Sequence, residues 1–325
     1  MFLGIEIGGT KLQLGVGSGK GGPLVAMRRL DVDPSRGADG IRRQIRDVAG
    51  PLVDEHRVAA VGIGFGGPVD RAAGRTIHSF QVDGWDDFPL ADWCRRALGL
   101  PTVLGNDSDL AGLGEARFGA GQGARIVFYS NVGSGIGGSL VIDGELYGGS
   151  RGVASEIGHL RPGPEAASAD QTVESVASGW GMAAVAKAKL LKSPEQPGAA
   201  DLLARSEGRI DRLTAVVLAE AYAAGNPLAA DVFLSGIRTY GWALAEVITL
   251  LAPHVVVIGG GVPQIGEALY LKPLRREIER YVFPPLQNQA EIVAAALGEE
   301  VVVHGALALA AAAHSPAGSR SSTGI

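Results

Sequence analysis

The chain has 325 residues, of which 46% are hydrophobic and 19% charged, and its formal net charge is −5 at pH 7. This length predicts about two domains, and the acidic balance argues against a general nucleic-acid surface, which usually needs a basic face. A single cysteine, Cys94, excludes an intramolecular disulfide and a thiolate zinc cluster. No signal peptide is visible and the longest apolar stretches are too short to span a bilayer, so we expect a cytoplasmic protein without a membrane partner.

The first third of the chain alternates predicted strands with amphipathic helices. Apolar residues recur at helical spacing in residues 41–52, and residues 58–65 form a continuous apolar run of the kind buried in a parallel sheet. In chain order, strands are predicted at 2–7, 12–16, 24–31, 58–65 and 102–104, and helices at 41–52, 90–98 and 110–118. This order indicates an α/β fold.

A glycine-rich segment at residues 118–124 is the best candidate for a domain linker. After it the strand–turn–strand pattern restarts, and a hairpin turn is predicted at Asp143-Gly144. Further strands are predicted at 125–132, 139–142 and 255–258, helices within 172–251 and at 305–313, and a disordered tail at 315–325. Since each half opens with a glycine-rich turn between strands, the pattern indicates a duplicated fold.

Two glycine-rich turns are the most informative motifs of the chain. Gly8-Gly9-Thr10-Lys11 joins the first two predicted strands, and Gly133-Ser134-Gly135 lies between the strands at 125–132 and 139–142. Glycine permits positive φ in tight turns and lets backbone N–H groups approach a ligand, and such concavities bind phosphate. Two such turns, each with a hydroxyl residue, predict a split nucleotide phosphate site with one half on each domain.

The second turn also has the GxGxxG spacing of dinucleotide sites, at Gly133, Gly135 and Gly138. A dinucleotide site needs this motif to open a helix, whereas here a predicted strand follows. The spacing therefore favours a hairpin turn. A nicotinamide-dependent dehydrogenase stays as a rival, and it would bind nicotinamide and not ATP.

Four polar residues outside the turns have both a structural and a chemical interpretation. Asp107 follows a predicted parallel strand, where α/β sheets bind ligands, but on local grounds a helix cap is favoured. Beside a phosphate site, the same carboxylate would accept the proton of an attacking hydroxyl. Glu156 and His159 share one face of a helical turn and are too few for a metal site, while Glu174 reads as an ordinary acid in the first turn of a helix.

Taken in order, these motifs resemble the ROK family of sugar kinases and related repressors. The resemblance covers residues 3–313 and is carried by the segments IGGTK, GxGIGG followed by a DG turn, and ASEIGH. It implies the two-lobed actin-like ATPase (ribonuclease H-like) fold, with ATP and a hydroxylated substrate in a central cleft. The small α/β lobe would cover residues 1–118, completed by a C-terminal helix at 299–314, and the large lobe residues 119–298.

The resemblance also implies a role for each matching residue. Asp107 looks like the general base, and Glu6 is a possible Mg²⁺ ligand through water. The implied substrate-binding residues are Gly67, Asn106, Asp107, Glu156, His159 and Glu174. The implied ATP-binding residues are Gly8, Gly9, Thr10, Lys11, Gly133, Ser134, Gly135, Gly259, Gly260 and Gly261.

The chain departs from the family pattern at three places. Glu6 stands where the family usually has Asp, so its longer side chain requires a shifted metal or loop. The segment between His159 and Glu174 lacks the family's Cys-x-Cys-Gly-x-x-Gly-Cys motif, so we expect no zinc site. The family's Gly-x-Pro-Gly turn is Gly-Gly-Pro here, beside the substrate, so the specificity is expected to differ from that for glucose.

The expected function is the transfer of the γ-phosphoryl group of ATP, with Mg²⁺, to a hydroxyl of a sugar or sugar-like polyol. The acceptor would be a hexose, a C7 cyclitol or an N-acylated amino sugar. The main alternative is a non-catalytic sugar-binding regulatory protein of the same family, and Glu6 is the residue that motivates it. The first motif begins at residue 3, so no DNA-binding domain and no nucleic-acid partner are expected. The family favours a homodimer.

Overall fold

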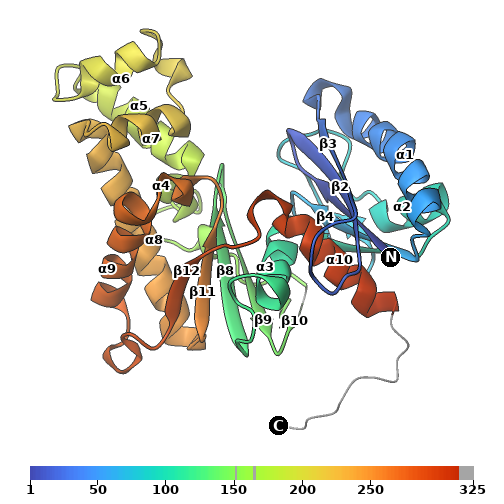
Figure 1. Cartoon of the computed structure of the whole chain (residues 1–325). Coiled ribbons are helices and arrows are strands. Elements are labelled where there is room, and N and C mark those ends of the chain that lie inside the picture. Colours follow the sequence, from blue (N-terminus) through green and yellow to red (C-terminus); the bar gives the residue numbers. More distant parts are fainter. Residues whose placement is uncertain (151, 164–165, 315–325) are drawn as a thin grey trace. The chain divides into compact units, whose positions relative to one another are not determined.

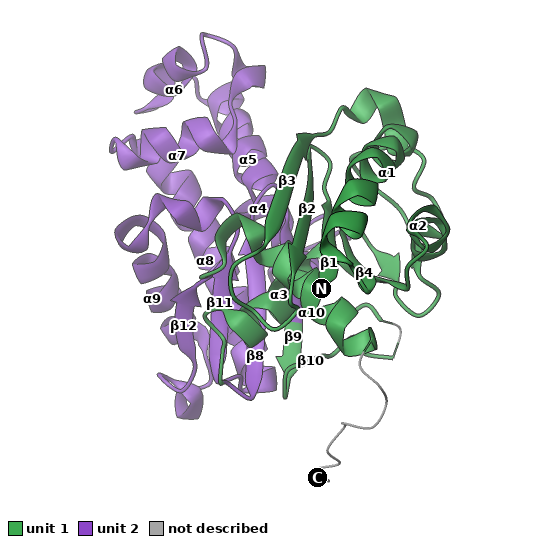
Figure 2. Cartoon of the chain, turned by 45° about the vertical axis from the view of Figure 1, so that its right-hand side comes forward, with its two compact units in different colours: residues 1–123, 140–154, 296–325 green, residues 124–139, 155–295 purple. Residues whose placement is uncertain are grey.

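The computed structural model describes residues 1–150, 152–163 and 166–314. The tail at 315–325, for which we expect disorder, lies outside the described residues. The chain divides into two compact units, coloured separately in Figure 2: residues 1–123, 140–154 and 296–325, and residues 124–139 and 155–295. These units depart from the predicted lobe ranges at residues 119–123, 140–154 and 296–298, and the division into ATPase lobes stays a prediction.

The first unit is built on a five-stranded sheet of order β3-β2-β1-β4-β7. Its antiparallel part is β1 (Phe2–Ile7), β2 (Lys11–Gly17) and β3 (Ala26–Asp31). β4 (Ala60–Phe65) and β7 (Thr102–Asn106) continue it in parallel with β1. All five predicted strands are present, and β1 has the predicted bounds. β4, which contains the continuous apolar run, is buried along its whole length and therefore lies in the interior of the sheet.

Helices cover both faces of this sheet. α1 (Gly37–His56) and α2 (Leu90–Leu98) pack on the face that carries Leu3 and Ile5, where their apolar residues form one buried cluster. α10 (Val301–His314), red in Figure 1, packs on β1 and β4 and against α3 (Asp107–Phe118). The shorter elements are η1 (Pro34–Arg36), β5 (Val69–Asp70), β6 (Arg75–Thr76) and η7 (Gly298–Glu300). The last helix of the chain therefore lies on its first strand.

The close packing of α10 accounts for part of the high glycine content, 49 residues. A Cβ at Gly62 in β4 would overlap the carbonyl oxygen of Ala306 in α10. A Cβ at Gly305 in α10 would overlap the carbonyl oxygen of Leu110 in α3. Glycine at these positions is required by the short distance between backbones rather than by a turn conformation.

The second five-stranded sheet has the order β10-β9-β8-β11-β12. Its strands are β8 (Ile126–Val132), β9 (Ile136–Ile142), β10 (Glu145–Leu146), β11 (Val255–Gly259) and β12 (Glu291–Ala294). In each sheet the first three strands along the chain lie side by side in reverse order. Two further strands then continue the sheet parallel to the first of them, here β11 and β12 beside β8. The two sheets share one strand order, which agrees with the predicted duplication. The Asp143-Gly144 turn joins β9 to β10 with φ of 52° and 76°, the turn that Asp-Gly favours.

Helices of the second unit fill the range 172–251 as predicted, but as several elements. They are α4 (Glu174–Ala177), α5 (Gly179–Lys192), α6 (Ala199–Arg205), η3 (Ile210–Arg212), α7 (Ala215–Ala223) and α8 (Pro227–Leu251). η2 (Ile157–His159) precedes this range. The segment after β11 adds η4 (Val262–Ile265), η5 (Glu267–Leu271), α9 (Lys272–Tyr281) and η6 (Pro284–Leu286). No helix in the described part of the chain has both the length and the hydropathy needed to cross a membrane.

Candidate functional site

The first glycine turn connects β1 to β2 in the first unit. The backbone N–H of Gly8 donates to the carbonyl of Lys11 over 2.9 Å, which closes the turn. Neither Gly8 nor Gly9 has a positive φ. The side chain of Gln81 lies on Gly9, where a Cβ would overlap it. The close approach of Gln81, rather than a left-handed backbone, therefore favours glycine at position 9.

Asp107 is the first residue of α3, and its neighbour Asn106 caps that helix. The Asn106 side-chain oxygen accepts hydrogen bonds from the backbone N–H groups of Ser108 (2.9 Å) and Asp109 (3.2 Å). Asn106 Nδ2 donates to the carbonyl of Gly67 over 3.0 Å, which fixes the loop after β4. The interpretation of Asp107 as a simple cap is therefore wrong, because Asn106 satisfies the helix terminus.

The Asp107 carboxylate lies beside the first glycine turn. A Cβ at Gly66 would be 3.5 Å from Asp107 Oδ2 and 3.6 Å from Gly8 Cα. The strand ends agree with this, since Ile7, Phe65 and the residue before Asp107 are in register across β1, β4 and β7. Burial raises the pKa of Asp107, although its Oδ1 accepts the N–H of Ser108 over 2.7 Å. A carboxylate and a potential phosphate turn therefore share the carboxyl edge of the first sheet.

Glu6 lies one residue before the end of β1 and is held by its cross-strand partner. Gln13, which is fully buried, donates from Nε2 to Glu6 Oε2 over 2.7 Å and to the carbonyl of Glu299 over 3.0 Å. Burial raises the pKa of Glu6, and the negative charges of Asp107 and Glu299 act in the same direction. Lys11, whose Nζ is 3.4 Å from Glu299, opposes the shift. Two carboxylates with raised pKa values thus lie at this edge, and the charge of Asp107 contributes to the shift of Glu6.

A magnesium ion fits this arrangement. Mg²⁺ ordinarily takes one or two carboxylates and completes its shell with phosphate oxygens and water. Glu6 offers such a carboxylate, and a cation beside it would offset the burial, and the negative charges of Asp107 and Glu299, that raise its pKa. Among the residues that the structure describes, no three His, Cys, Asp or Glu side chains gather in a way that could hold a metal alone. The predicted absence of zinc stays a prediction.

The second glycine turn joins β8 to β9 in the second unit and opens no helix, so the dehydrogenase alternative has no support. Gly133 N–H donates to the carbonyl of Gly135 over 2.9 Å. Glu174, the first residue of α4, accepts the N–H of Ile136 over 2.6 Å, and a Cβ at Gly135 would lie 2.6 Å from the same oxygen. Glu174 is thus an anchor for this turn, a contact that its position in the sequence does not reveal.

The Gly259–Gly261 segment lies against the second glycine turn. Gly259 is paired with Asn131 at the end of β8. Gly260 has a φ of +93°, and a Cβ there would overlap the carbonyl oxygen of Val132. Neither Gly133 nor Gly261 has a heavy atom within 4 Å of where a Cβ would be. The second unit therefore brings two predicted ATP-binding segments together and leaves open space beside both.

Glu156 directly precedes η2 and His159 is its last residue, and both are exposed. The N–H of His159 donates to the carbonyl of Glu156 over 3.0 Å, so the predicted helical turn is a 3₁₀ turn. The turn packs on β9, since a Cβ at Gly158 would overlap the carbonyl oxygen of Ile136. Ser155 just before it has a φ of +64°, an uncommon backbone conformation for serine. The predicted substrate residues of the second unit thus surround the strands that carry the second glycine turn.

Glu115 is a buried carboxylate that the sequence analysis missed. The residue has no exposed surface, and its carboxylate accepts hydrogen bonds from the backbone N–H groups of Ala120 (2.7 Å), Ala296 (2.9 Å) and Leu297 (2.8 Å). These donors belong to two of the four chain segments at which the compact units join in sequence, near residues 123 and 296. Glu115 thus ties these two segments to α3, the helix that begins with Asp107.

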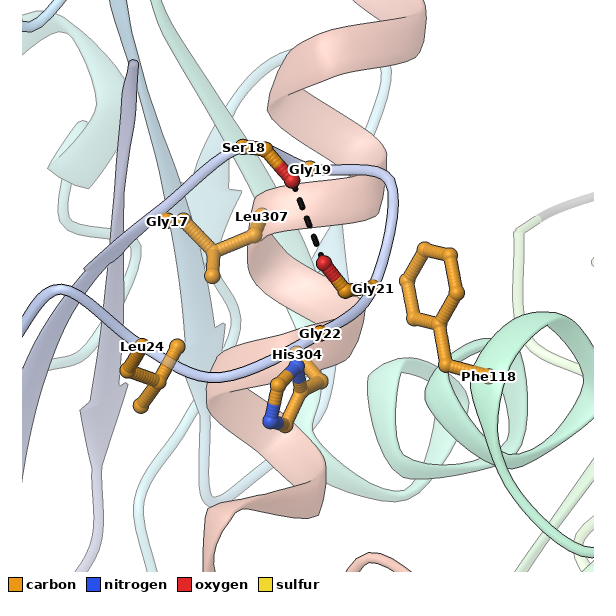
Figure 3. A pocket seen from close by; sticks show the side chains of 9 residues that line it. All are labelled: Gly17, Ser18, Gly19, Gly21, Gly22, Leu24, Phe118, His304 and Leu307. Carbon is orange, nitrogen blue, oxygen red and sulfur yellow. Dashed lines mark hydrogen bonds between the residues drawn. The ribbon is translucent and has the colours of Figure 1, made fainter.

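A small pocket in the first unit lies apart from these residues (Figure 3). It is lined by Gly17, Ser18, Gly19, Gly21, Gly22, Leu24, Phe118, His304 and Leu307. The loop over it is held by a hydrogen bond from Ser18 Oγ to the carbonyl of Gly21, 3.2 Å. A Cβ at Gly19 would lie 2.9 Å from the carbonyl oxygen of Leu307, so glycine lets this loop pack on α10. Its walls are mostly apolar or backbone, as expected of a packing crevice.

Comparison with known proteins identifies the family. A profile described as "ROK family" matches residues 2–313. The chain belongs to the ROK family. Relatives include glucokinases of Streptomyces coelicolor (32% identical, covering 95% of this chain and 97% of that protein) and Halalkalibacterium halodurans (31%, covering 94% and 93%).

Solved structures of ROK proteins agree with this assignment. A ROK family glucokinase from Streptomyces griseus, in complex with glucose and AMPPNP, has a TM-score of 0.80 at 34% identity and covers 95% of this chain and 98% of that one. A ROK family transcriptional regulator has a TM-score of 0.79 at 21% identity, covers 95% of this chain and 77% of that chain, and shares the fold. The prediction of the two-lobed actin-like ATPase fold is confirmed.

Proposed function

We propose that this ROK protein is an ATP-dependent kinase that transfers the γ-phosphoryl group to a hydroxyl of a sugar or sugar-like polyol. The observation that carries the proposal is the convergence of Asp107 and the first glycine turn at adjacent strand ends. The likeness to glucokinases over nearly the whole chain supports it, including the one whose structure holds glucose and AMPPNP.

Asp107 would act as the general base. It would orient the attacking hydroxyl and accept its proton, a role that a raised pKa favours because the base then lies closer to the working pH. Phosphoryl transfer needs mainly positioning and charge stabilisation. N–H groups of residues 9–11, 134–135 and 259–261 would bind phosphate oxygens, while those of Gly8 and Gly133 close the two turns. Lys11 and Ser134 would add side-chain contacts. Mg²⁺, when bound near Glu6, would neutralise charge on the phosphates.

The acceptor is proposed to be a hexose with a free primary hydroxyl, with a C7 cyclitol or an N-acylated amino sugar as the next candidates. Gly67, Asn106, Glu156, His159 and Glu174 would bind its ring hydroxyls. Asn106 and Glu174 are already positioned by the hydrogen bonds to Gly67 and Ile136, so they would meet the substrate in fixed orientations.

The test is a coupled assay of ADP release with Mg-ATP over a panel of hexoses, N-acyl hexosamines and C7 cyclitols. Acceptor-dependent release that is abolished in Asp107→Asn is the expected result, and the acceptor with the highest kcat/KM would be the substrate. Absence of acceptor-dependent release from every compound, in protein that still binds one of them by calorimetry, would contradict the kinase proposal.

A non-catalytic sugar-binding regulatory protein is the second candidate, and the environment of Glu6 is the observation that favours it. The Glu6 carboxylate is engaged by Gln13 over 2.7 Å instead of facing open solvent. If that contact prevents metal binding, Glu6→Asp should create ADP release where the native chain has none. Release by the native chain with a Mg²⁺ dependence of the usual millimolar order would remove this alternative.

A further inference from the structure

Trp180 is an exposed aromatic residue in the first turn of α5, the helix that begins beside the second glycine turn. Its relative exposure is 49%, whereas Trp85 is buried at 1%. Single exposed apolar residues are common on protein surfaces, so exposure alone assigns no role. The position of Trp180 in α5 is what distinguishes it.

The backbone of Trp180 is bound to the second glycine turn. The N–H of Gly179 donates to the carbonyl of Gly133 over 2.8 Å, and the N–H of Trp180 donates to the carbonyl of Ser134 over 3.2 Å. A Cβ at Gly179 would lie 2.8 Å from that Gly133 oxygen, so the helix start and the turn are in close contact. The indole is therefore attached, through its own main chain, to a turn proposed to hold phosphates.

A second exposed apolar residue lies on the neighbouring helix. A Cβ at Gly179 would be 3.2 Å from Cβ of Ala215, so the starts of α5 and α7 touch. Val216, the next residue, is 67% exposed. α7 also contacts η4, which directly follows the Gly259–Gly261 segment. Trp180 and Val216 are thus two exposed apolar residues at the touching starts of two helices, within the second unit, and these helices contact or adjoin both of its open glycine segments.

We propose that Trp180 is a nucleotide-binding residue that stacks on the base of ATP, with Val216 extending the apolar surface. The inference rests on the proposed kinase function and adds to it the side chain that holds the base. In a nucleotide the base is joined to the phosphates by one ribose, so a base whose phosphates lie on the second turn falls close to that turn. A planar base stacks well on an indole face and displaces water from it.

The experiment is calorimetric titration of the full-length protein with Mg-ADP, Mg-AMPPNP and Mg-tripolyphosphate, which lacks a base. Trp180→Ala is expected to weaken ADP and AMPPNP binding about 5- to 150-fold, the usual effect of removing a base-stacking aromatic side chain. Tripolyphosphate and sugar affinities should change less than about 2-fold. Trp180→Phe should recover most of the nucleotide affinity, and Leu191→Ala, a 74% exposed residue near the end of the same helix, should change nothing.

The outcomes separate this inference from the function on which it rests. Turnover with ATP in both the native chain and Trp180→Ala, with ADP affinity changed less than 2-fold, would overturn the role of Trp180 and leave the kinase proposal intact. Failure of the native chain to bind any nucleotide would overturn both. Equal weakening of ADP and tripolyphosphate would show damage to the turn itself and would also overturn stacking, and Trp180→Phe gives the same test if Trp180→Ala does not fold.

Discussion

The Asp107 carboxylate is partly buried and lies near a second acid, Glu6. We expect this environment to lower the stability of the folded protein and to favour the proposed activity. Burial raises its pKa, and the field of Asp107 adds to the raised pKa of Glu6. The ionised form therefore costs folding free energy at neutral pH, as is common at active sites. The hydrogen bond from the N–H of Ser108 favours the ionised form, and an amide oxygen at this position could still accept it, though more weakly.

We predict that Asp107→Asn loses about 10²- to 10⁴-fold in kcat, the range that a general base ordinarily contributes. The melting temperature at pH 7 should stay equal or rise, since the variant keeps the oxygen acceptor and removes a buried charge. Sugar affinity measured by calorimetry should be retained. A variant with near-native kcat would remove Asp107 from the role of base.

The pH dependence of the reaction follows from the same shift. As a base, Asp107 must be ionised, so kcat/KM should fall as the pH falls through its pKa in the folded protein. Because that pKa lies above the usual 3.8, the acid limb should lie at higher pH than that of a free aspartate. Stability runs the other way, because between the unfolded and folded pKa values the folded state binds more protons, and stability falls as pH rises. A rate profile that stays flat down to pH 4, in protein still folded by circular dichroism, would refute the assignment.

At the scale of elements, the packing of α10 predicts unequal effects for two helical glycines. Gly305→Ala should destabilise by about 1–3 kcal/mol, because its methyl group would overlap the Leu110 carbonyl and force α10 away from α3. Gly236→Ala in α8 is the matched control, since the nearest atoms would be 3.4 Å away, an ordinary contact. That variant should be neutral or more stable by up to about 1 kcal/mol through helix propensity. Urea unfolding of both proteins measures the difference, and equal effects would contradict the packing argument.

The elements that could be predicted from sequence are those with a strong local pattern. β1 and α2 have the predicted bounds, because continuous burial and helical periodicity are properties of neighbouring residues. β12 and α9 were not predicted; β12 has only four residues and an exposed end, and its pairing with β11 comes from a partner strand more than thirty positions away.

The candidate site was predictable in its residue types but not in its contacts. The two glycine turns, Asp107 and the motifs that carry the family resemblance could be recognised because each is a short segment of the chain. The bond from Glu174 to the backbone of Ile136 joins residues 38 positions apart, and that from Gln13 to the carbonyl of Glu299 joins residues 286 apart. A local sequence pattern cannot predict contacts between residues so far apart in the chain, because these contacts depend on the completed fold.

At the scale of the whole molecule, Glu115 connects α3 to two of the segments at which the compact units join. Glu115→Ala would leave three partly buried backbone N–H groups without their acceptor, so we predict a loss of about 1–3 kcal/mol in unfolding free energy. Glu115→Gln keeps one acceptor oxygen and should lose less. Glu145→Ala, which breaks an exposed ion pair with Arg117, is the control and should cost under about 1 kcal/mol. Denaturant unfolding tests the order, and a Glu115→Ala protein as stable as the control would contradict it.

The position of α10 has a consequence for how the chain is made. β1, β4 and α3 leave the ribosome early, but the helix that covers them comes from residues 301–314. Until then the glycine face of the first sheet stays in contact with water, and Glu115 lacks the donors from Ala296 and Leu297. Domains usually fold from the N-terminus as they emerge. Here the unit whose synthesis begins first is the last to be finished, and a nascent chain stalled before residue 300 would carry an unfinished first unit beside a second unit whose residues have all been made.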